Sequence, residues 1–342
     1  MLDANGNRAA EGLRVLEDIA RFILDDARLA ALAKDLRHVV RAAIPPDAVH
    51  ERDTAGDVGT TISTADEMVR ARLVDLVRAN AARVGEALRT AEEAAKLLAA
   101  PAVAAALEAA RYRCYQLELG LLSRLPAWLL HRVRLYALVD TSLTDRPVEV
   151  AAAVARGGAG AVQLRAKHLD VRAYRDLAAR VQDACRTHGA LFVVNDQVAV
   201  ARALGADAVH VGQDDLAVAD VRTVVGPTCA IGLSCHTPEQ VRQALSSGSC
   251  NSGGADYLGL GPMYSTTTKP AEPCRGPELL DAVRGLLDRP SFAIGGLDAA
   301  RVAELLPRLP HGVAVAGALC RAADPEKAAA ELLMLLVPDA WG

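Results

Sequence analysis

The stretch AVQLRAKHLDVRAYRDLAARVQDACRTHGALFVVND, residues 161–196, decides the fold. It begins with a short apolar run, continues through a segment rich in Ala, Arg and Leu from Asp170 to His188, and ends in a second apolar run. Short runs without polar alternation are typical of strands that are buried on both faces. The segment between them has the length and composition of a crossover helix. The stretch therefore predicts a strand, a helix and a second strand parallel to the first.

The same pattern recurs through the second half of the chain. Apolar runs with polar or glycine residues at their C-terminal ends occupy residues 135–140, 161–165, 191–196, 208–213, 230–234, 257–261, 292–296 and 313–317. Eight strand–helix units within about two hundred residues predict an α/β fold, the closed (β/α)8 TIM barrel. In this architecture the C-terminal strand ends form the rim of the active site. The residues that follow each run are therefore the first candidates for chemistry.

The first part of the chain has a different periodicity. Residues 2–125 show a helical pattern and no convincing strand, which predicts an α-helical domain over residues 1–130 and the barrel over residues 131–342. Pro126 is expected to end the last helix before the first barrel strand.

A sequence repeat lies within the helical domain. The pattern Asn-x-x-Arg-x-x-Glu-x-Leu-Arg-x-x-Glu occurs at Asn5, Arg8, Glu11, Leu13, Arg14 and Glu17, and again at Asn80, Arg83, Glu86, Leu88, Arg89 and Glu92. One interpretation is two solvated amphipathic helices with weak Arg–Glu pairs on their surfaces. The other is that both copies converge on the polar, glycine-rich segment 52–61 to form a ligand site. The sequence identifies no ligand for such a site.

Composition excludes several classes of function. A chain of 342 residues with 51% hydrophobic content has material for two domains. The net charge of -4 argues against a nucleic-acid-binding protein, but it is compatible with a small anion bound in a local cationic pocket. We expect no membrane partner, because no signal segment and no apolar run of about 20 residues is present. The seven cysteines lack zinc or disulfide spacing, which predicts reduced, mostly buried thiols in a cytoplasmic protein.

Cations and carboxylates follow neighbouring strands. Gln163, Arg165 and Lys167 end the second run, and the two cations suit a phosphate or diphosphate, although isolated residues of this kind are more often surface charges. Asp196 follows the third run and Asp215 the fourth, and carboxylates at neighbouring strand ends can hold one Mg²⁺ together with substrate phosphate oxygens. An alternative role for Asp215 is the N-cap of the next helix. We favour the metal site because a cationic strand lies beside it.

The remaining strand ends predict a second anion position. Ser234 ends the fifth run, and the loop after the sixth run carries hydroxyls and a cation that could close over an anion, at Ser265, Thr266, Thr267, Thr268 and Lys269. The last two runs end in Gly295-Gly296 and Ala316-Gly317, where backbone amides can approach a phosphate. The rim thus implies two anionic groups, one bound with metal and one by backbone.

Covalent catalysis is not indicated. His210 follows an apolar run and is expected to be buried structure, and His236 lacks an acidic partner in the sequence. Neither the Gly-Lys-Ser/Thr phosphate loop nor the spaced-glycine dinucleotide fingerprint is present. This favours catalysis by stabilisation of ions.

In their order, these motifs resemble the thiamine phosphate synthase family over residues 134–336. The shared elements are Gln-Leu-Arg-x-Lys, Asn-Asp, Val-His-x-Gly-Gln-x-Asp, Gly-x-Ser-x-His-Thr, Thr-x-Thr-Lys and Ile-Gly-Gly. The resemblance implies a transferase that joins hydroxymethylpyrimidine diphosphate to a thiazole phosphate and releases diphosphate with the help of Mg²⁺.

The resemblance also implies roles for individual residues. Asp196 and Asp215 would bind Mg²⁺, and Arg165, Lys167, Ser234 and Lys269 would be catalytic. The pyrimidine diphosphate would be held by Gln163, Leu164, Arg165, Ala166, Lys167, Asn195, Ser234 and Lys269. The thiazole phosphate would be held by Thr266, Thr267, Thr268, Gly296, Ala316 and Gly317. Two features depart from the family: many members have Ser where Gly317 stands, and the stretch 246–254 is longer than usual.

The helical half resembles a domain sometimes fused to such synthases and regarded as a second, non-ribokinase type of hydroxymethylpyrimidine phosphate kinase. The matching stretches are 2–8, 11–18, 52–54 and the second copy of the repeat. This resemblance implies ATP as a further substrate. Two alternatives stay open: a thiazole phosphate aromatase (isomerase) for the barrel, and a docking or regulatory module for the helical half. Barrels of this type often self-associate, so a homo-oligomer is compatible with the sequence.

Overall fold

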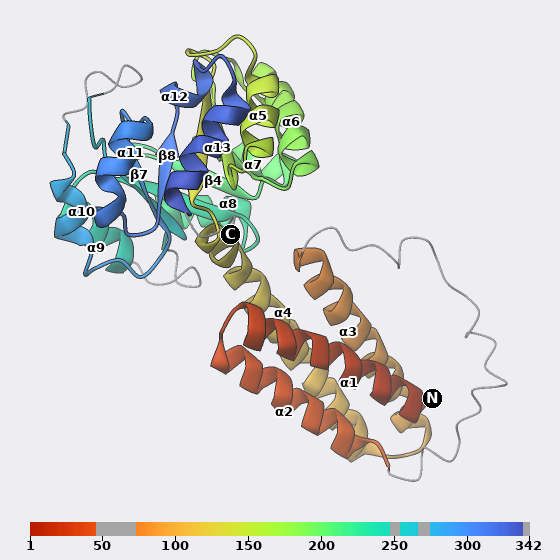
Figure 1. Cartoon of the computed structure of the whole chain (residues 1–342). Helices are drawn as coiled ribbons and strands as arrows, with labels where there is room; N and C mark the ends of the chain where they lie inside the picture. The colour runs from red at the N-terminus through yellow and green to blue at the C-terminus, as the bar shows by residue number, and fades with distance from the viewer. Residues whose placement is uncertain (46–72, 247–253, 266–273, 338–342) are drawn as a thin grey trace. The chain divides into compact units, whose positions relative to one another are not determined.

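The chain folds into two compact units, which a computed structural model describes over residues 1–45, 73–246, 254–265 and 274–337 (Figure 1). The helical unit comprises Met1–Leu125 and the barrel unit comprises Pro126–Gly342.

The described part of the helical unit contains helices and no strand, as expected. Its elements are α1 (Leu2–Asp18), the π-helical turn η1 (Ile19–Ile23), α2 (Ala27–Ala43), α3 (Leu73–Leu97) and α4 (Pro101–His131). Helix α1 packs against both α2 and α3. Gly12 permits the close approach to α3, because a Cβ at this position would lie 3.2 Å from the backbone oxygen of Asn80.

The prediction that Pro126 ends the last helix is wrong. Helix α4 continues through Pro126 to His131. A proline within a helix costs about 3 kcal/mol because it removes one backbone hydrogen bond. Burial beyond the proline offsets this cost: Leu130 and Val133 are fully or almost fully buried in the cluster that fills the barrel interior.

The barrel unit is a closed ring of eight parallel strands in sequential order, which confirms the predicted TIM barrel. All eight predicted runs are strands: β1 (Leu135–Asp140), β2 (Ala161–Arg165), β3 (Leu191–Asn195), β4 (Ala208–Val211), β5 (Ala230–Cys235), β6 (Tyr257–Leu260), β7 (Ser291–Ile294) and β8 (Gly312–Val315).

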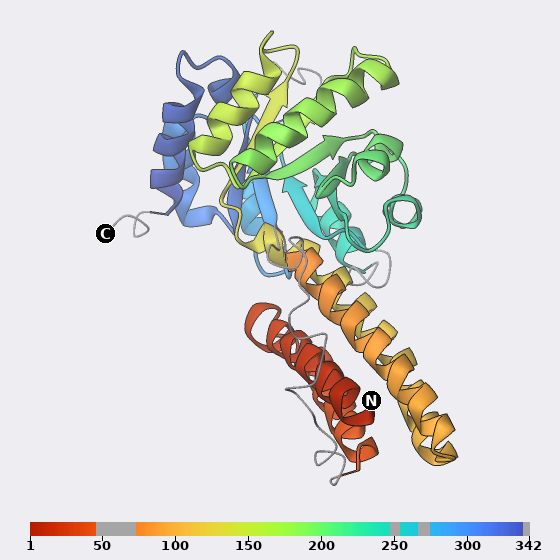
Figure 2. The ribbon, with the colours of Figure 1, turned by 90° about the vertical axis from the view of Figure 1, so that its right-hand side faces the viewer.

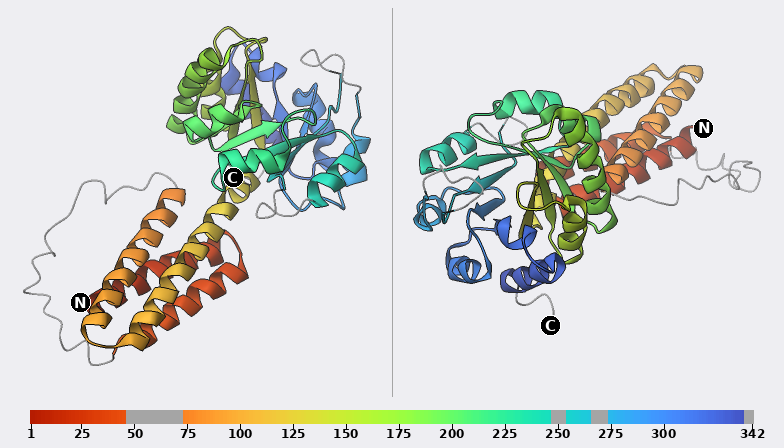
Figure 3. Two further views of the ribbon diagram at one scale, coloured as in Figure 1. Left: turned by 180° about the vertical axis from the view of Figure 1, so that it is seen from behind. Right: turned by 90° about the horizontal axis from the view of Figure 1, so that it is seen from above.

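Helices surround the ring of strands (Figures 2 and 3). They are α5 (Pro147–Arg156), α6 (Val171–Thr187), α7 (Val198–Leu204), α8 (Val218–Val225), α9 (Pro238–Ser246), α10 (Glu278–Val283), α11 (Ala299–Leu305), the 3₁₀ turn η5 (Leu306–Arg308), α12 (Gly317–Cys320) and α13 (Pro325–Leu336). Thr237 Oγ1 accepts a hydrogen bond from the backbone amide of Gln240 in the first turn of α9.

Side chains alternate along each strand between two cores. Leu135, Val139 and Leu164 pack outward against the helices. Tyr136, Phe292 and their inward-facing neighbours fill the interior of the barrel. This parity decides which residues can reach the rim from inside the ring, because successive side chains of a strand point to opposite faces.

Of the described cysteines, Cys274 is exposed and the others are buried free thiols, while Cys250 lies outside the described residues. No helix in the described ranges is long and apolar enough to cross a membrane.

Candidate active site

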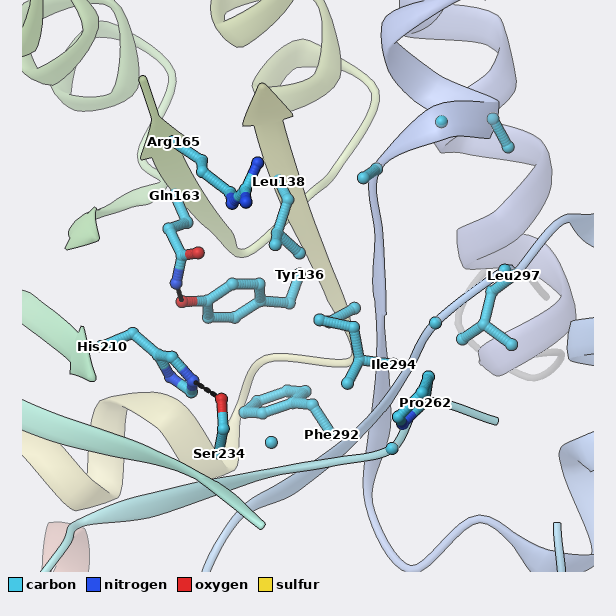
Figure 4. Close-up of a pocket in the computed structure, with 18 of the residues that line it drawn as sticks. Tyr136, Leu138, Gln163, Arg165, His210, Ser234, Pro262, Phe292, Ile294 and Leu297 are labelled. Atoms are coloured by element: carbon cyan, nitrogen blue, oxygen red, sulfur yellow. Dashed lines mark hydrogen bonds between the residues drawn. The ribbon is translucent and has the colours of Figure 1, made fainter. Parts of the chain in front are cut away.

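A cavity of about 610 Å³ opens at the C-terminal ends of the barrel strands (Figure 4). Every strand contributes to its wall, through Tyr136, Gln163, Asn195, His210, Ser234, Gly259, Ile294 and Ala314. The lining also includes Gly296, Ala316 and Gly317 from the predicted phosphate position. Of the predicted site residues in the described ranges, the cavity brings together Gln163, Arg165, Asn195, Ser234, Gly296, Ala316 and Gly317, whereas Lys167, Asp196 and Asp215 are not part of its lining.

Arg165 is held in place by a carboxylate that the sequence analysis did not assign. Its guanidinium donates to Asp140, which lies opposite it in the β1–β2 register and is almost completely buried. The backbone amide and the hydroxyl of Ser142 also donate to Asp140, at 2.8 and 2.7 Å. Burial by itself would raise the pKa of Asp140, but these hydrogen bonds outweigh it and the pKa lies below its ordinary value. Arg165 is therefore an oriented cation on the cavity wall.

Lys167, Asp196 and Asp215 lie together at the ends of β2, β3 and β4. Lys167 Nζ is 3.2 Å from Asp196 Oδ2. Burial raises the pKa of Asp196, Lys167 opposes that shift and the carboxylate of Asp215 adds to it, so that the pKa lies above its ordinary value. The alternative role of Asp215 as a helix N-cap is wrong: α8 begins at Val218 after Ala217, and Asp215 Oδ2 instead accepts from the amide of Gly212 at 2.7 Å.

These residues fit a magnesium ion. Two carboxylates that repel each other at the end of a cationic strand would be stabilised by a divalent cation, and Mg²⁺ commonly takes one or two protein carboxylates and completes its shell with water and phosphate oxygens. Within the described residues no group of three or more His, Cys, Asp or Glu side chains forms a complete protein cage. The two carboxylates would leave the rest of the shell of such a metal to water and phosphate oxygens.

A chain of hydrogen bonds crosses the barrel beneath the cavity. Gln163 Nε2 donates to the Tyr136 hydroxyl at 2.9 Å, and that hydroxyl is 3.1 Å from the hydroxyl of Tyr257. The Tyr257 hydroxyl lies 3.2 Å from His210 Nδ1, and His210 Nε2 lies 2.9 Å from Ser234 Oγ. Figure 4 shows the two ends of this chain. It connects β2, β1, β6, β4 and β5 and fixes the orientation of each side chain.

The expectation that His210 is only buried structure is wrong, because this residue lines the cavity and contacts Ser234. Burial raises the pKa of Tyr257 far above its ordinary value, so its hydroxyl stays neutral beside the imidazole. A neutral phenol does not stabilise an imidazolium as a carboxylate does. The imidazole therefore orients the Ser234 hydroxyl through one nitrogen and contacts a neutral phenol through the other.

Some predicted residues lie elsewhere. Leu164 and Ala166 pack in the outer core, with their side chains away from the cavity. Thr266, Thr267, Thr268 and Lys269 lie outside the described residues, as does most of the stretch 246–254. Sequence reasoning missed Asp140, Tyr136, Arg301 and Arg321. Strand parity could have found the first two, since both share the inward face of β1.

The sequence repeat of the helical unit forms two separate ion-pair clusters. Buried Glu17 of α1 pairs with Arg37 of α2 at 2.8 Å. Buried Glu92 of α3 pairs with Arg111 of α4 at 3.2 Å. The first cluster joins α1 to α2, and the second joins α3 to α4. Among the described residues, these glutamates therefore connect neighbouring helices, and the segment 52–61 on which both copies were expected to converge lies outside the described ranges.

The comparison with protein families decides the membership of the chain. A model described as thiamine monophosphate synthase matches residues 135–319, which is more than half of the chain and covers every barrel strand. The chain belongs to the thiamine monophosphate synthase family. A second model, described as the ThiD2 family, matches residues 1–119 of the helical unit.

Related synthases share both units. The chain is 40% identical over 338 residues to the thiamine-phosphate synthase of Gloeobacter violaceus, covering 97% of this chain and 95% of that protein. It is 38% identical over 336 residues to the thiamine-phosphate synthase of Synechocystis sp., covering 98% and 95%. Among solved structures, the thiamine phosphate pyrophosphorylase from Pyrococcus furiosus matches with a TM-score of 0.55 and 31% identity, over 63% of this chain and 100% of that chain.

Proposed function

We propose that the barrel joins a pyrimidine diphosphate to a thiazole phosphate by a dissociative substitution assisted by Mg²⁺. Membership of the thiamine monophosphate synthase family gives the overall reaction, the condensation of a pyrimidine with a thiazole precursor. The observation that carries the finer proposal is the convergence of Arg165, Lys167, Asp196, Asp215 and Ser234 at one end of the barrel. The thiazole phosphate aromatase alternative is set aside, because an isomerase that binds one phosphate has no use for this set.

Charge stabilisation is the main task of these residues. The bond between the pyrimidine methylene carbon and the diphosphate oxygen breaks, and the electron pair leaves with the diphosphate. Arg165 and Lys167 stabilise the negative charge that develops on the leaving group, together with Lys269. Ser234, held by His210, adds an oriented hydroxyl. The electron-rich aminopyrimidine tolerates the benzylic-type cation, and the thiazole nitrogen then forms the new bond to that carbon.

Asp196 and Asp215 would hold the metal. When bound, Mg²⁺ supplies Lewis-acid neutralisation of the diphosphate charge. Tyr136, Tyr257 and Phe292 on the inward faces of the strands give the cavity an apolar lining beside these polar groups.

A second activity is proposed for the helical unit. The ThiD2 match over residues 1–119 supports it as a pyrimidine phosphate kinase that uses ATP and supplies the diphosphate to the barrel. The alternative is a docking or regulatory module without chemistry.

Two parallel reactions test both proposals. One starts from pyrimidine diphosphate, thiazole phosphate and Mg²⁺, and the other from pyrimidine monophosphate, ATP, thiazole phosphate and Mg²⁺. We expect thiamine phosphate in both. Product from the diphosphate alone would leave the helical unit as a docking or regulatory module, and the absence of product from both would overturn the proposed reaction.

Single substitutions assign the residues in the same assay. We expect Asp196→Ala and Asp215→Ala to abolish Mg²⁺-dependent product formation from the diphosphate while the melting temperature stays near that of the wild type. Asp220→Ala, at an exposed position on α8, serves as the matched control. Undiminished turnover in either metal-site variant would rule out the metal assignment. Full kinase activity in both Arg14→Ala and Arg89→Ala would exclude the repeat from the kinase site.

A further inference from the structure

The wall of the cavity at β7 and β8 contains two arginines, Arg301 and Arg321, to which the sequence analysis gave no role. Both line the cavity together with Gly296 and Gly317, where a phosphate is expected. Two guanidinium groups give this wall a positive charge that is separate from the Arg165 and Lys167 pair on β2.

Arg301 is already held by the protein. Its Nη1 donates to the carbonyl oxygen of Gly296, and its guanidinium lies 4.8 Å from the ring centre of Tyr264. The nearby Asp298 also lines the cavity, but its Oδ1 accepts from the backbone amide of Arg301 as the N-cap of α11. The guanidinium of Arg301 thus adds positive charge to the cavity wall, but these two contacts restrict its orientation.

Arg321 is different, because its side chain has no such constraint. The residue is exposed at the cavity, and within the described residues its guanidinium makes no hydrogen bond and no ion pair. A guanidinium offers five donors in a planar fork that matches the oxygens of a phosphate. Arg321 is therefore available to bind an anion without first breaking a bond within the protein.

Glycine at residue 317 leaves room for the guanidinium of Arg321 in the conformation that the structure shows. A Cβ at Gly317 would lie 2.3 Å from Nη2, 3.0 Å from Cζ and 3.2 Å from Nη1 of Arg321. The backbone does not require glycine there, since Gly317 is not among the glycines with positive φ. The missing side chain thus leaves the guanidinium head room beside Gly317.

We infer that Arg321 binds the phosphate of the thiazole substrate through the space left open by Gly317, and that it determines the preference for the phosphorylated over the dephosphorylated thiazole. This inference rests on the proposed function of the barrel. It also supplies a side-chain contact beside Gly317, the position at which many family members have Ser.

Calorimetric binding to the full-length protein tests the inference, with inorganic diphosphate and Mg²⁺ present to fill the other anion position. We expect Arg321→Gln to weaken binding of the thiazole phosphate by about 10- to 100-fold, the usual range for a hydrogen-bonded charged group. Binding of the dephosphorylated thiazole and the KM for pyrimidine diphosphate should stay unchanged. Arg308→Gln, which removes an exposed arginine of the same unit that pairs with Asp281, is the matched control and should bind as the wild type does.

A second variant tests the role of the space itself. Gly317→Ala keeps the backbone amide but displaces the guanidinium, so it should weaken binding of the thiazole phosphate by a similar factor. In the double variant with Arg321→Gln the two effects should not add, because both remove the same contact.

The outcomes separate this inference from the proposed function. If Arg321→Gln binds the thiazole phosphate as tightly as the wild type, or loses affinity for both thiazoles equally, the inference is overturned. The same holds if the wild type does not bind the thiazole phosphate. If binding follows the expectation but the wild type makes no product from the diphosphate, the inference stands and the proposed reaction fails.

Discussion

At the scale of single residues, two buried phenols connect polar side chains on opposite sides of the cavity by hydrogen bonds. Tyr136 and Tyr257 carry hydrogen bonds from Gln163 on one side of the barrel to His210 on the other. Burial raises the pKa of both phenols well above the ordinary value, so they are neutral near pH 7. They position other side chains and do not exchange protons with the substrate.

Removal of one phenol hydroxyl should therefore reduce both stability and activity. In Tyr257→Phe, Tyr136 and His210 each lose a buried partner, and we expect the free energy of unfolding to fall by about 1–3 kcal/mol. The kcat/KM for pyrimidine diphosphate should fall by roughly tenfold, equivalent to about 1.4 kcal/mol, because His210 no longer orients Ser234. Urea unfolding and steady-state kinetics measure the two effects. Tyr112→Phe, at an exposed position in α4, should change neither, and an unaltered kcat/KM in Tyr257→Phe would refute the positioning role.

At the scale of elements, the opposite end of the barrel is closed by the last turn of α4 and the loop before β8. His311 Nε2 donates to the carbonyl oxygen of Leu130 at 3.1 Å, while Arg134 donates to His311 Nδ1 at 2.9 Å. This arrangement requires the neutral imidazole. Burial and the positive charge of Arg134 lower the pKa of His311 to about 4.

This contact should make the barrel sensitive to acid. The unfolded chain takes up a proton at His311 near pH 6.5, whereas the folded chain takes it up only near pH 4. The stabilising contribution is therefore complete above about pH 6.5 and is lost as the pH falls toward 4. We expect the melting temperature to fall between pH 7.5 and pH 5 by more in the wild type than in His311→Gln, which keeps a donor for Leu130.

The exposed variant His168→Gln should keep the pH dependence of the wild type. Identical pH dependence in His311→Gln and the wild type would show that His311 does not carry the effect.

At the scale of the whole molecule, the two units have separate hydrophobic cores. Leu13, Leu36 and Leu88 lie in the core of the helical unit, whereas Val162 and Leu258 lie in the outer core of the barrel. In the part of the chain that the structure describes, the closed barrel and the candidate site are formed by residues of the second unit. Ligands of the barrel should therefore stabilise one unit more than the other.

Because the two units have separate cores, calorimetric unfolding of the full chain should show two transitions. At a thiazole phosphate concentration of about 100 times its dissociation constant, binding adds about 2.7 kcal/mol to the stability of the folded barrel. We expect one transition to move to higher temperature and the other to stay in place. A single transition that moves as a whole would indicate that the units unfold together.

Much of this protein is readable from its sequence. The eight apolar runs and their spacing predicted every strand, because a strand buried on both faces leaves a local signal of a few consecutive residues. Since parallel strands bring their C-terminal ends to one rim, the same pattern predicted that Gln163, Asn195 and Ser234 would face one chamber. The ordered motifs at these ends carried the family resemblance.

Only the tertiary structure decided which side chains pair. The contact of Asp140 with Arg165, the phenol chain to His210, the placement of Arg321 beside Gly317 and the passage of α4 through Pro126 all depend on this structure. The Asp140–Arg165 contact and the phenol chain join residues on different strands. Helix α4 persists because residues beyond Pro126 are buried in the barrel interior. Local pattern determines where a strand begins and which way its residues face, whereas the pairing of polar groups is decided by distances and rotamers that exist only once the barrel is closed.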